Sequence, residues 1–134
     1  MIVADTSLIA SLLLWTPATA EAEAVLEKDS EWIAPPLWRS ELRNVLATQI
    51  KVMGLAANDA LALFEKAEET VGDSEIQDDT ELILSLAHGR KLSAYDAEYV
   101  ALAQILKIKL VTFDTGILKA VPGISVAPKS FVLM

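Results

Sequence analysis

Four acidic side chains stand at the ends of predicted secondary-structure elements. Asp5 follows a short apolar run at residues 2–4, and Asp114 follows a second apolar run that ends in Thr112 and Phe113. Glu41 and Asp96 lie in the first turns of predicted helices. The C-termini of parallel strands and the N-termini of the helices that follow them project to one edge of a sheet, so these four carboxylates can converge there.

Four carboxylates in one cleft repel one another strongly. Two like charges about 5 Å apart, at an effective dielectric constant near 20, repel by roughly 3 kcal/mol. The cluster therefore requires protons or cations. Oxygen ligands without any cysteine suit Mg²⁺ or Mn²⁺, as one or two ions, and such ions activate water in phosphodiester hydrolysis.

Each of these acids also has a purely structural interpretation. Asp5 and Asp114 are suitable helix caps or turn residues. Asp96 near a helix N-terminus is favoured by the helix dipole by about 0.3–1 kcal/mol. Glu41 could be a solvated helix residue paired with a neighbouring arginine. Taken singly, any of them could be structural, and only their shared placement favours a site.

Apolar runs and helical periodicity alternate along the chain, which predicts an α/β fold. A hydroxyl residue is expected to cap the first helix. Strands are predicted at residues 2–4, 32–34, 74–77, 108–112 and 124–126, and helices at residues 8–15, 19–26, 37–53, 58–71, 79–88, 94–106 and 115–120. This order predicts one domain, residues 1–134, with a parallel sheet of about five strands flanked by helices on both faces.

Length and composition fit a single cytoplasmic domain. The chain has 134 residues, 53% of them hydrophobic, and no cysteine for a disulfide framework. Its longest apolar stretch, residues 8–15, is too short to cross a bilayer, so no membrane association is expected.

The net charge of −8 argues against a nucleic-acid ligand, because lysine and arginine supply most non-specific affinity for phosphates. The excess of acidic residues is unevenly distributed along the chain, however. Residues 21–31 hold five acids against one lysine, and residues 59–81 hold nine against one lysine. A locally basic groove is therefore possible elsewhere on the surface.

Several other catalytic classes are excluded by composition. The only histidine, His88, lies at a predicted helix end, and cysteine is absent, so Ser/His/Asp and Cys/His catalysis are not available. The chain also lacks a glycine-rich phosphate loop. Phosphatases with a strand-end Asp nucleophile usually need a second Asp two residues later, where this chain has Ser7.

Two arginines and two groups of aromatic residues have alternative roles. Arg39 and Arg43, one helical turn apart on either side of Glu41, either belong to a solvated face or contact phosphates. Tyr95 and Tyr99, four residues apart, are predicted to pack inside the fold. The three tryptophans are predicted to lie in the core or at an interface.

Three motifs surround the acids, with Glu41 between the first and the second. They read Met-Ile-Val-Ala-Asp-Thr-Ser at residues 1–7, Leu-Ser-Ala-Tyr-Asp-Ala-Glu-Tyr-Val-Ala-Leu-Ala at residues 92–103 and Leu-Val-Thr-Phe-Asp at residues 110–114. Over essentially the whole chain they resemble PIN-domain ribonucleases, and most closely the VapC-type toxins of bacterial and archaeal toxin–antitoxin pairs.

The resemblance implies roles for six residues, of which four are acids and two carry hydroxyl groups. The implied acidic metal site consists of Asp5, Glu41, Asp96 and Asp114, and the implied hydroxyls that orient carboxylates or water belong to Ser7 and Thr112. Many relatives carry another charged residue after the last Asp, whereas this chain continues with Thr115 and Gly116.

The resemblance further implies a metal-dependent endoribonuclease that acts as a toxin. Its expected partners are an RNA substrate, a cognate antitoxin and a second copy of the chain in a homodimer. Two alternatives stay open: a catalytically idle PIN fold that serves as a binding module, and a small metal-dependent phosphohydrolase.

Overall fold

Five short parallel strands form one sheet in the order β3-β2-β1-β4-β5. The computed structural model describes residues 1–134. The strands are β1 (Ile2–Ala4), β2 (Trp32–Ala34), β3 (Val71–Asp73), β4 (Leu110–Val111) and β5 (Ser125–Val126). The predicted parallel α/β fold is confirmed.

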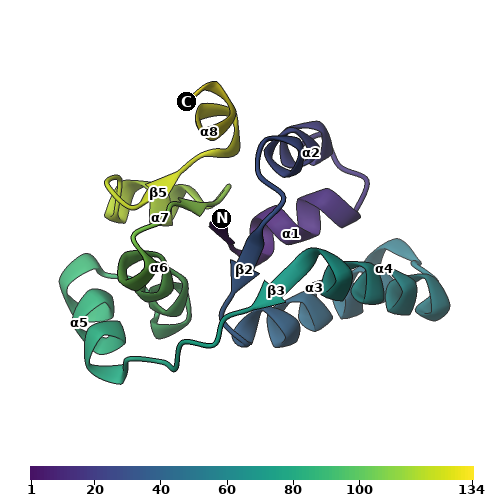
Figure 1. Ribbon diagram of the computed structural model, residues 1–134. Coiled ribbons are helices and arrows are strands. Elements are labelled where there is room, and N and C mark those ends of the chain that lie inside the picture. The colour runs from purple at the N-terminus through teal and green to yellow at the C-terminus, as the bar shows by residue number, and fades with distance from the viewer.

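Eight helices cover the two faces and one end of this sheet (Figure 1). They are α1 (Thr6–Leu13), α2 (Thr19–Lys28), α3 (Leu37–Met53), α4 (Ala57–Thr70), α5 (Thr80–Arg90), α6 (Ala94–Leu106), α7 (Thr115–Ala120) and α8 (Pro128–Leu133). Helices α5 and α6 lie on one side of the sheet, and α1, α3 and α4 lie on the other (Figure 1). The predicted bounds of α3, α6 and α7 are confirmed.

The strand order reverses direction between β1 and β4. The chain first adds β2 and β3 on one side of β1, and then adds β4 and β5 on the other side. In open parallel sheets, the crevice outside the carboxyl ends of the strands at such a reversal is where ligands bind. Residues that directly follow β1 and β4 are therefore in the position most suited to a site.

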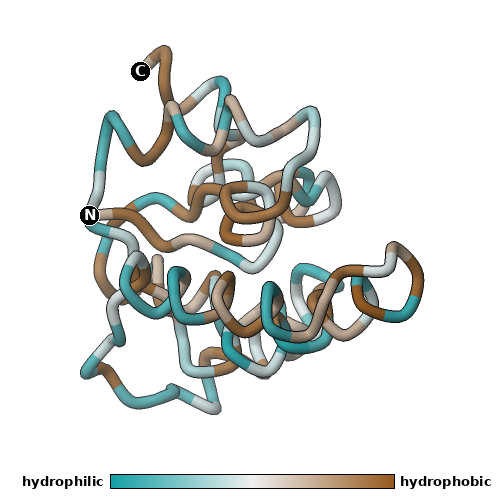
Figure 2. Tube along the Cα trace, turned by 90° about the vertical axis from the view of Figure 1, so that its right-hand side faces the viewer, coloured by the Kyte–Doolittle hydropathy of each residue, from teal (hydrophilic) through white to brown (hydrophobic).

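The core lies along the central strands. All three residues of β1 and both residues of β4 are buried, as expected for parallel strands that are covered on both faces. Figure 2 shows hydrophobic segments gathered in the middle of the molecule. Trp32 and Trp38 are fully buried, whereas the side chain of Trp15 is 94% exposed.

The N-terminal cap of α1 differs from the predicted hydroxyl. Asp5 is the cap residue, and its carboxylate accepts a hydrogen bond from the backbone N–H of Leu8. Thr6 and Ser7 lie inside the first turn instead. A carboxylate caps as well as a hydroxyl does, so both hydroxyl side chains are left for other contacts.

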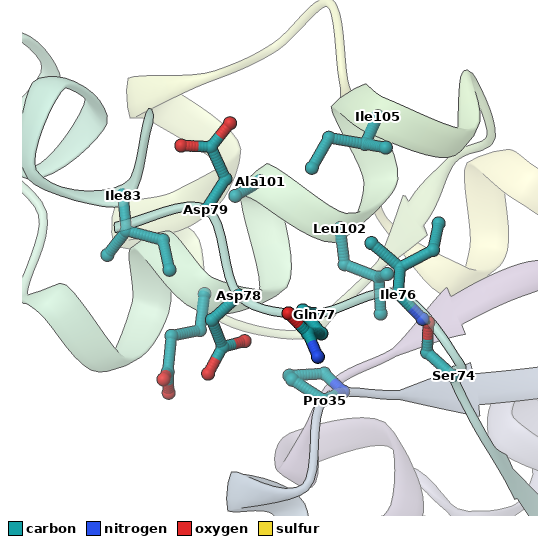
Figure 3. A pocket seen from close by; sticks show the side chains of 11 residues that line it. Pro35, Ser74, Ile76, Gln77, Asp78, Asp79, Ile83, Ala101, Leu102 and Ile105 are labelled. Carbon is teal, nitrogen blue, oxygen red and sulfur yellow. The ribbon is translucent and has the colours of Figure 1, made fainter. Parts of the chain in front are cut away.

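The third strand was predicted at the wrong place. The helix predicted at residues 58–71 is present as α4 but ends at Thr70, because Val71 pairs with β2 as the first residue of β3. The predicted strand at residues 74–77 belongs instead to an irregular connection that crosses to α5. Figure 3 shows Ile76 of this connection facing Leu102 of α6 across a small cavity. Pairing with β2, which lies far away in the sequence, thus places the strand directly after α4 and takes one residue from the predicted helix.

Some apolar side chains of α3 and α4 are exposed. Near the end of α3, Ile50 and Met53 are exposed, and Leu61 of α4 is exposed as well. Gly54 ends α3 with φ 71°, a left-handed conformation that glycine adopts without strain. The outer ends of both helices thus carry apolar surface beyond the core.

Helix α8 was not predicted. It packs against α2, and Phe131 is its buried anchor. Lys28 of α2 donates hydrogen bonds to the backbone carbonyls of Phe131 at 2.6 Å and Met134 at 2.7 Å. A lysine at these C-terminal carbonyls also complements the helix dipole.

None of the helices combines the length and the apolar character needed to cross a membrane.

Replacing the N-cap residue of α6 should destabilise the fold. Ser93 Oγ accepts a hydrogen bond from the backbone N–H of Asp96 at 3.0 Å. We expect Ser93→Ala to lower the free energy of unfolding by about 1 kcal/mol, measured by urea titration. The control is Ser85→Ala, at an exposed position inside α5, which should leave stability unchanged or slightly raised. Equal losses in both variants would contradict the capping role.

Candidate metal and catalytic site

The pairing of β1 with β4 determines where Asp5 lies. Val3 is in register with Leu110, and Ala4 with Val111. One residue further along each strand, Asp5 and Thr112 emerge side by side. The hydroxyl of Thr112 donates a hydrogen bond of 2.5 Å to Asp5 Oδ2.

Two hydroxyl groups hold the Asp5 carboxylate. Ser7 Oγ donates to Asp5 Oδ1 at 2.7 Å, and Thr112 Oγ1 donates to Oδ2. Each hydroxyl in turn accepts a backbone hydrogen bond, from Phe113 N–H to Ser7 at 3.0 Å and from Asp114 N–H to Thr112 at 2.9 Å. The backbone donors leave each hydroxyl proton directed at the carboxylate, which is thus fixed in one orientation.

Burial dominates the electrostatics of Asp5, whose side chain is almost completely enclosed. Burial raises its pKa to about 6, against the lowering effect of the hydrogen bonds from Ser7, Thr112 and Leu8. The negative charge of Asp114 raises the pKa further. At neutral pH the carboxylate is mostly ionised in an unfavourable environment, and a cation beside it would relieve that penalty.

Asp114 lies across from Asp5 and is exposed. It caps α7, since its Oδ1 accepts a hydrogen bond of 2.9 Å from the backbone N–H of Ile117. Its Oδ2 accepts no hydrogen bond within the chain. A Cβ atom at Gly116 would lie only 3.0 Å from Asp114 Oδ1, so glycine at that position leaves room for the carboxylate.

Asp96 joins this group from the first turn of α6. Its pKa is raised, chiefly by burial, then by the charge of Asp114 and, less, by that of Glu41. Asp114 is therefore close enough to both Asp5 and Asp96 for its charge to oppose their ionisation, as expected of carboxylates that face one cleft.

Glu41 is held by two hydroxyl groups that were not among the predicted site residues. Tyr99 Oη donates to Glu41 Oε1 at 2.5 Å, and Thr6 Oγ1 donates to the same oxygen at 3.0 Å. Tyr99 is buried, and burial followed by the hydrogen bond to Glu41 raises its pKa well above its usual range, so the phenol keeps its proton. Glu41 Oε2 accepts no hydrogen bond within the chain.

A sequence signal for Tyr99 was available. It lies three residues after Asp96, and residues three apart share one face of a helix.

The prediction that both tyrosines pack inside the fold is wrong for Tyr95, whose side chain is 63% exposed. It is incomplete for Tyr99, which is buried and also bonds to a site acid.

The donor atoms suit a hard divalent cation, although they do not enclose one. In this arrangement no three acidic or histidine side chains lie close enough together to form a metal-binding group. The available donors are all carboxylate and hydroxyl oxygens, and the carboxylates are electrostatically coupled. Mg²⁺ commonly uses one or two carboxylates and completes its shell with water and substrate phosphate, so this open, oxygen-only group fits such an ion.

The structure places Arg39 away from these carboxylates. Its guanidinium forms two hydrogen bonds with Asp73 of β3, at 2.7 and 3.1 Å, and contacts Glu68 of α4 at 3.4 Å. Arg43 lies over the ring of Phe64 at 5.0 Å. Both arginines therefore face α4. For Arg39 this placement favours pairing with acids over the expected phosphate contact, although the acids belong to β3 and α4 and not to α3 itself. Arg43 forms no ion pair and packs on an aromatic ring instead.

Comparisons with known proteins identify the fold. A model of the PIN domain family matches residues 2–123. PAE2754 from Pyrobaculum aerophilum has a similar structure, with a TM-score of 0.77 and 21% identity over 98% of this chain and 93% of that one. A chain in a toxin–antitoxin complex from Klebsiella pneumoniae has a TM-score of 0.72 and 23% identity, over 96% and 98% of the two chains. No curated protein matches this chain.

Ionisation of Asp5 should make metal-free protein less stable as the pH rises. Its pKa is about 6 in the folded chain against an ordinary value of 3.8. Between those values the folded chain holds a proton that the unfolded chain has lost, so the free energy of unfolding falls with rising pH, by about 3 kcal/mol once the pH exceeds 6. Urea titrations in EDTA between pH 4 and pH 7.5 measure this slope.

The matched variant for this measurement is Asp5→Asn, which cannot ionise. We expect its stability to lack that part of the pH dependence, so that the two curves diverge across the interval. Asp29 and Asp73 have lowered pKa values and titrate below it in both proteins. Parallel curves for wild type and variant would contradict the raised pKa.

Arg39→Ala should affect stability slightly and in a salt-dependent way. The pair it forms with Asp73 is well aligned but partly exposed, and such pairs contribute up to about 1 kcal/mol. We expect a loss of that size at low salt and a smaller one at high salt, measured by urea titration. Arg43→Ala, which removes no ion pair, is the control. A loss that does not vary with salt would exclude the ionic contribution.

Proposed function

This chain belongs to the PIN domain family, and on that premise we propose that it is a metal-dependent endoribonuclease, the toxin of a toxin–antitoxin pair. The observation that carries the proposal is the group of coupled carboxylates at the reversal of strand order, where Asp5 is buried and oriented by two hydroxyls. A module that only binds partners would have no need for a buried carboxylate that two hydroxyls hold in one orientation.

In this proposal each acid has its own role. Asp5, Asp96 and Asp114 hold the principal Mg²⁺ or Mn²⁺ ion, directly or through water. When bound, such an ion supplies activation of water and stabilisation of charge on the phosphate. Glu41 completes the site, because Tyr99 and Thr6 hold one of its oxygens and leave Oε2 to orient water or to accept its proton.

The acidic net charge does not exclude an RNA substrate under this proposal. Divalent cations bound at the site would invert the sign of the local field that its acids create. Most other acids lie at residues 21–31 and 59–81, outside the four site positions. Affinity would then come from the ion and from contacts with the bases, since Arg39 is engaged in ion pairs on the α4 side.

An antitoxin partner is proposed on two grounds. The similar chain from Klebsiella pneumoniae belongs to a toxin–antitoxin complex. In addition, exposed apolar side chains at the outer ends of α3 and α4 form the kind of surface that protein partners cover. An inserted Arg or Lys would match the acidic site, because a guanidinium pairs well with carboxylates. The homodimer and the cytoplasmic location stay predictions.

The test is cleavage of a labelled set of single-stranded RNAs in Mg²⁺, Mn²⁺ or EDTA. We expect cleavage only with metal, and a loss of roughly a hundredfold or more in Asp5→Asn, Asp96→Asn and Asp114→Asn. Asp79→Asn is the matched control, because Asp79 caps α5 as Asp114 caps α7 but lies outside the site. Cleavage of nucleoside monophosphates and not RNA would instead favour the small phosphohydrolase.

Thermal melts separate a metal ligand from a helix cap. Adding Mg²⁺ or Mn²⁺ should raise the melting temperature of the wild type in proportion to the logarithm of the ion concentration, because the ion binds only the folded site. Asp96→Asn should gain much less, and in EDTA it should be no less stable than the wild type, since it removes a repelling charge. A variant that is destabilised in EDTA but gains equally from metal would identify Asp96 as structural.

A further inference from the structure

A hollow of about 560 Å³ opens directly beside Glu41. Thr6 and Glu41 line the hollow on the side of the carboxylate site and are hydrogen-bonded to each other. Tyr95 of α6 lines it as well. The hollow is therefore continuous with the proposed catalytic site. Any ligand that fills the hollow also lies against Glu41 and against Thr6, whose hydroxyl is hydrogen-bonded to Glu41.

The charge of this hollow is unsuited to phosphate. Apart from Glu41, its lining consists of uncharged side chains, among them Ser40, Asn44 and Tyr95, and it contains no lysine or arginine. A phosphate group placed there would meet a carboxylate without any compensating cation. A neutral ligand with an aromatic face and hydrogen-bonding edges meets no such penalty.

Tyr95 offers an aromatic face to that ligand. Its side chain is 63% exposed, although the residue stands in the ordered first turn of α6. Its phenol makes no hydrogen bond within the chain, so the fold does not require the ring for a polar contact. Because Tyr95 directly precedes Asp96, the ring is tied by the backbone to the carboxylate site.

We propose that this hollow binds one nucleobase of a single-stranded RNA next to the cleaved phosphate, stacked on Tyr95. This inference rests on the proposed ribonuclease function and adds a base subsite to it. Base-to-aromatic stacking is a usual way to hold single-stranded RNA and does not require positive charge. Asn44 and Ser40 supply the donors and acceptors that can read the edge of the base.

The experiment is single-turnover cleavage of a labelled mixed-sequence single-stranded RNA pool, and then of one sequence that the pool shows to be cut. We expect Tyr95→Ala to raise the half-saturating enzyme concentration by roughly 5- to 150-fold. Tyr95→Leu should behave like Tyr95→Ala, because it keeps apolar area but has no ring. Tyr95→Phe, which keeps the ring, should stay close to the wild type.

A second arm uses RNAs with a single abasic nucleotide at each position around the cut. At one position, loss of the base should weaken wild-type cleavage and should have little further effect in Tyr95→Ala. This non-additivity reports contact between that base and the ring. Trp15→Ala, which removes an exposed aromatic residue outside the hollow, should leave cleavage of every RNA unchanged.

The outcomes separate this inference from the function on which it rests. Failure of the wild type to cleave or bind any RNA would overturn both. Cleavage that is the same in wild type, Tyr95→Ala and Tyr95→Leu would overturn the base subsite alone and leave the ribonuclease in place. A loss in Tyr95→Ala that is equal for intact and abasic RNAs at every position would also overturn it, since the ring would then act without touching a base.

Discussion

A buried carboxylate needs hydrogen bonds from groups that cannot turn away, and the arrangement around Asp5 meets this constraint. The parallel pairing of β1 with β4 brings Thr112 beside Asp5, and the first turn of α1 brings Ser7. Backbone donors from the chain after β4 fix both hydroxyls. The strands of the sheet centre, the first helix and the loop after β4 are thereby tied to one charged group whose pKa is raised by burial.

Capping a helix and serving a site are compatible uses of the same carboxylate. Asp5 and Asp114 each accept a backbone N–H of the following helix through Oδ1. This contact orients the second oxygen, because a carboxylate with one atom fixed at a helix N-terminus has little freedom left. In each of these residues, Oδ1 caps the helix and Oδ2 is left to the site, so the capping role and the site role use different oxygens of the same carboxylate.

Acidic, basic and uncharged side chains occupy separate regions around the site. The carboxylates gather at the reversal of strand order, the arginines of α3 are engaged toward α4, and a hollow without cationic residues lies beside Glu41. Such a surface gives a polyanion little non-specific attraction, so recognition has to rely on the cation site and on neutral contacts. The exposed apolar ends of α3 and α4 lie apart from this polar centre and suit a protein partner instead.

Local sequence determined the elements whose signals are local. The bounds of α3, α6 and α7 were predicted correctly from helical periodicity and from local end signals such as the glycine after α3, since helices depend on contacts within a few residues. The acids at strand ends could likewise be picked out from the sequence. Only the tertiary structure decided that β3 comprises Val71–Asp73, that Tyr99 holds Glu41 and that Arg39 pairs with Asp73. Each of those contacts joins residues far apart in the chain, and their partners are selected by strand register and helix packing, which no local pattern encodes.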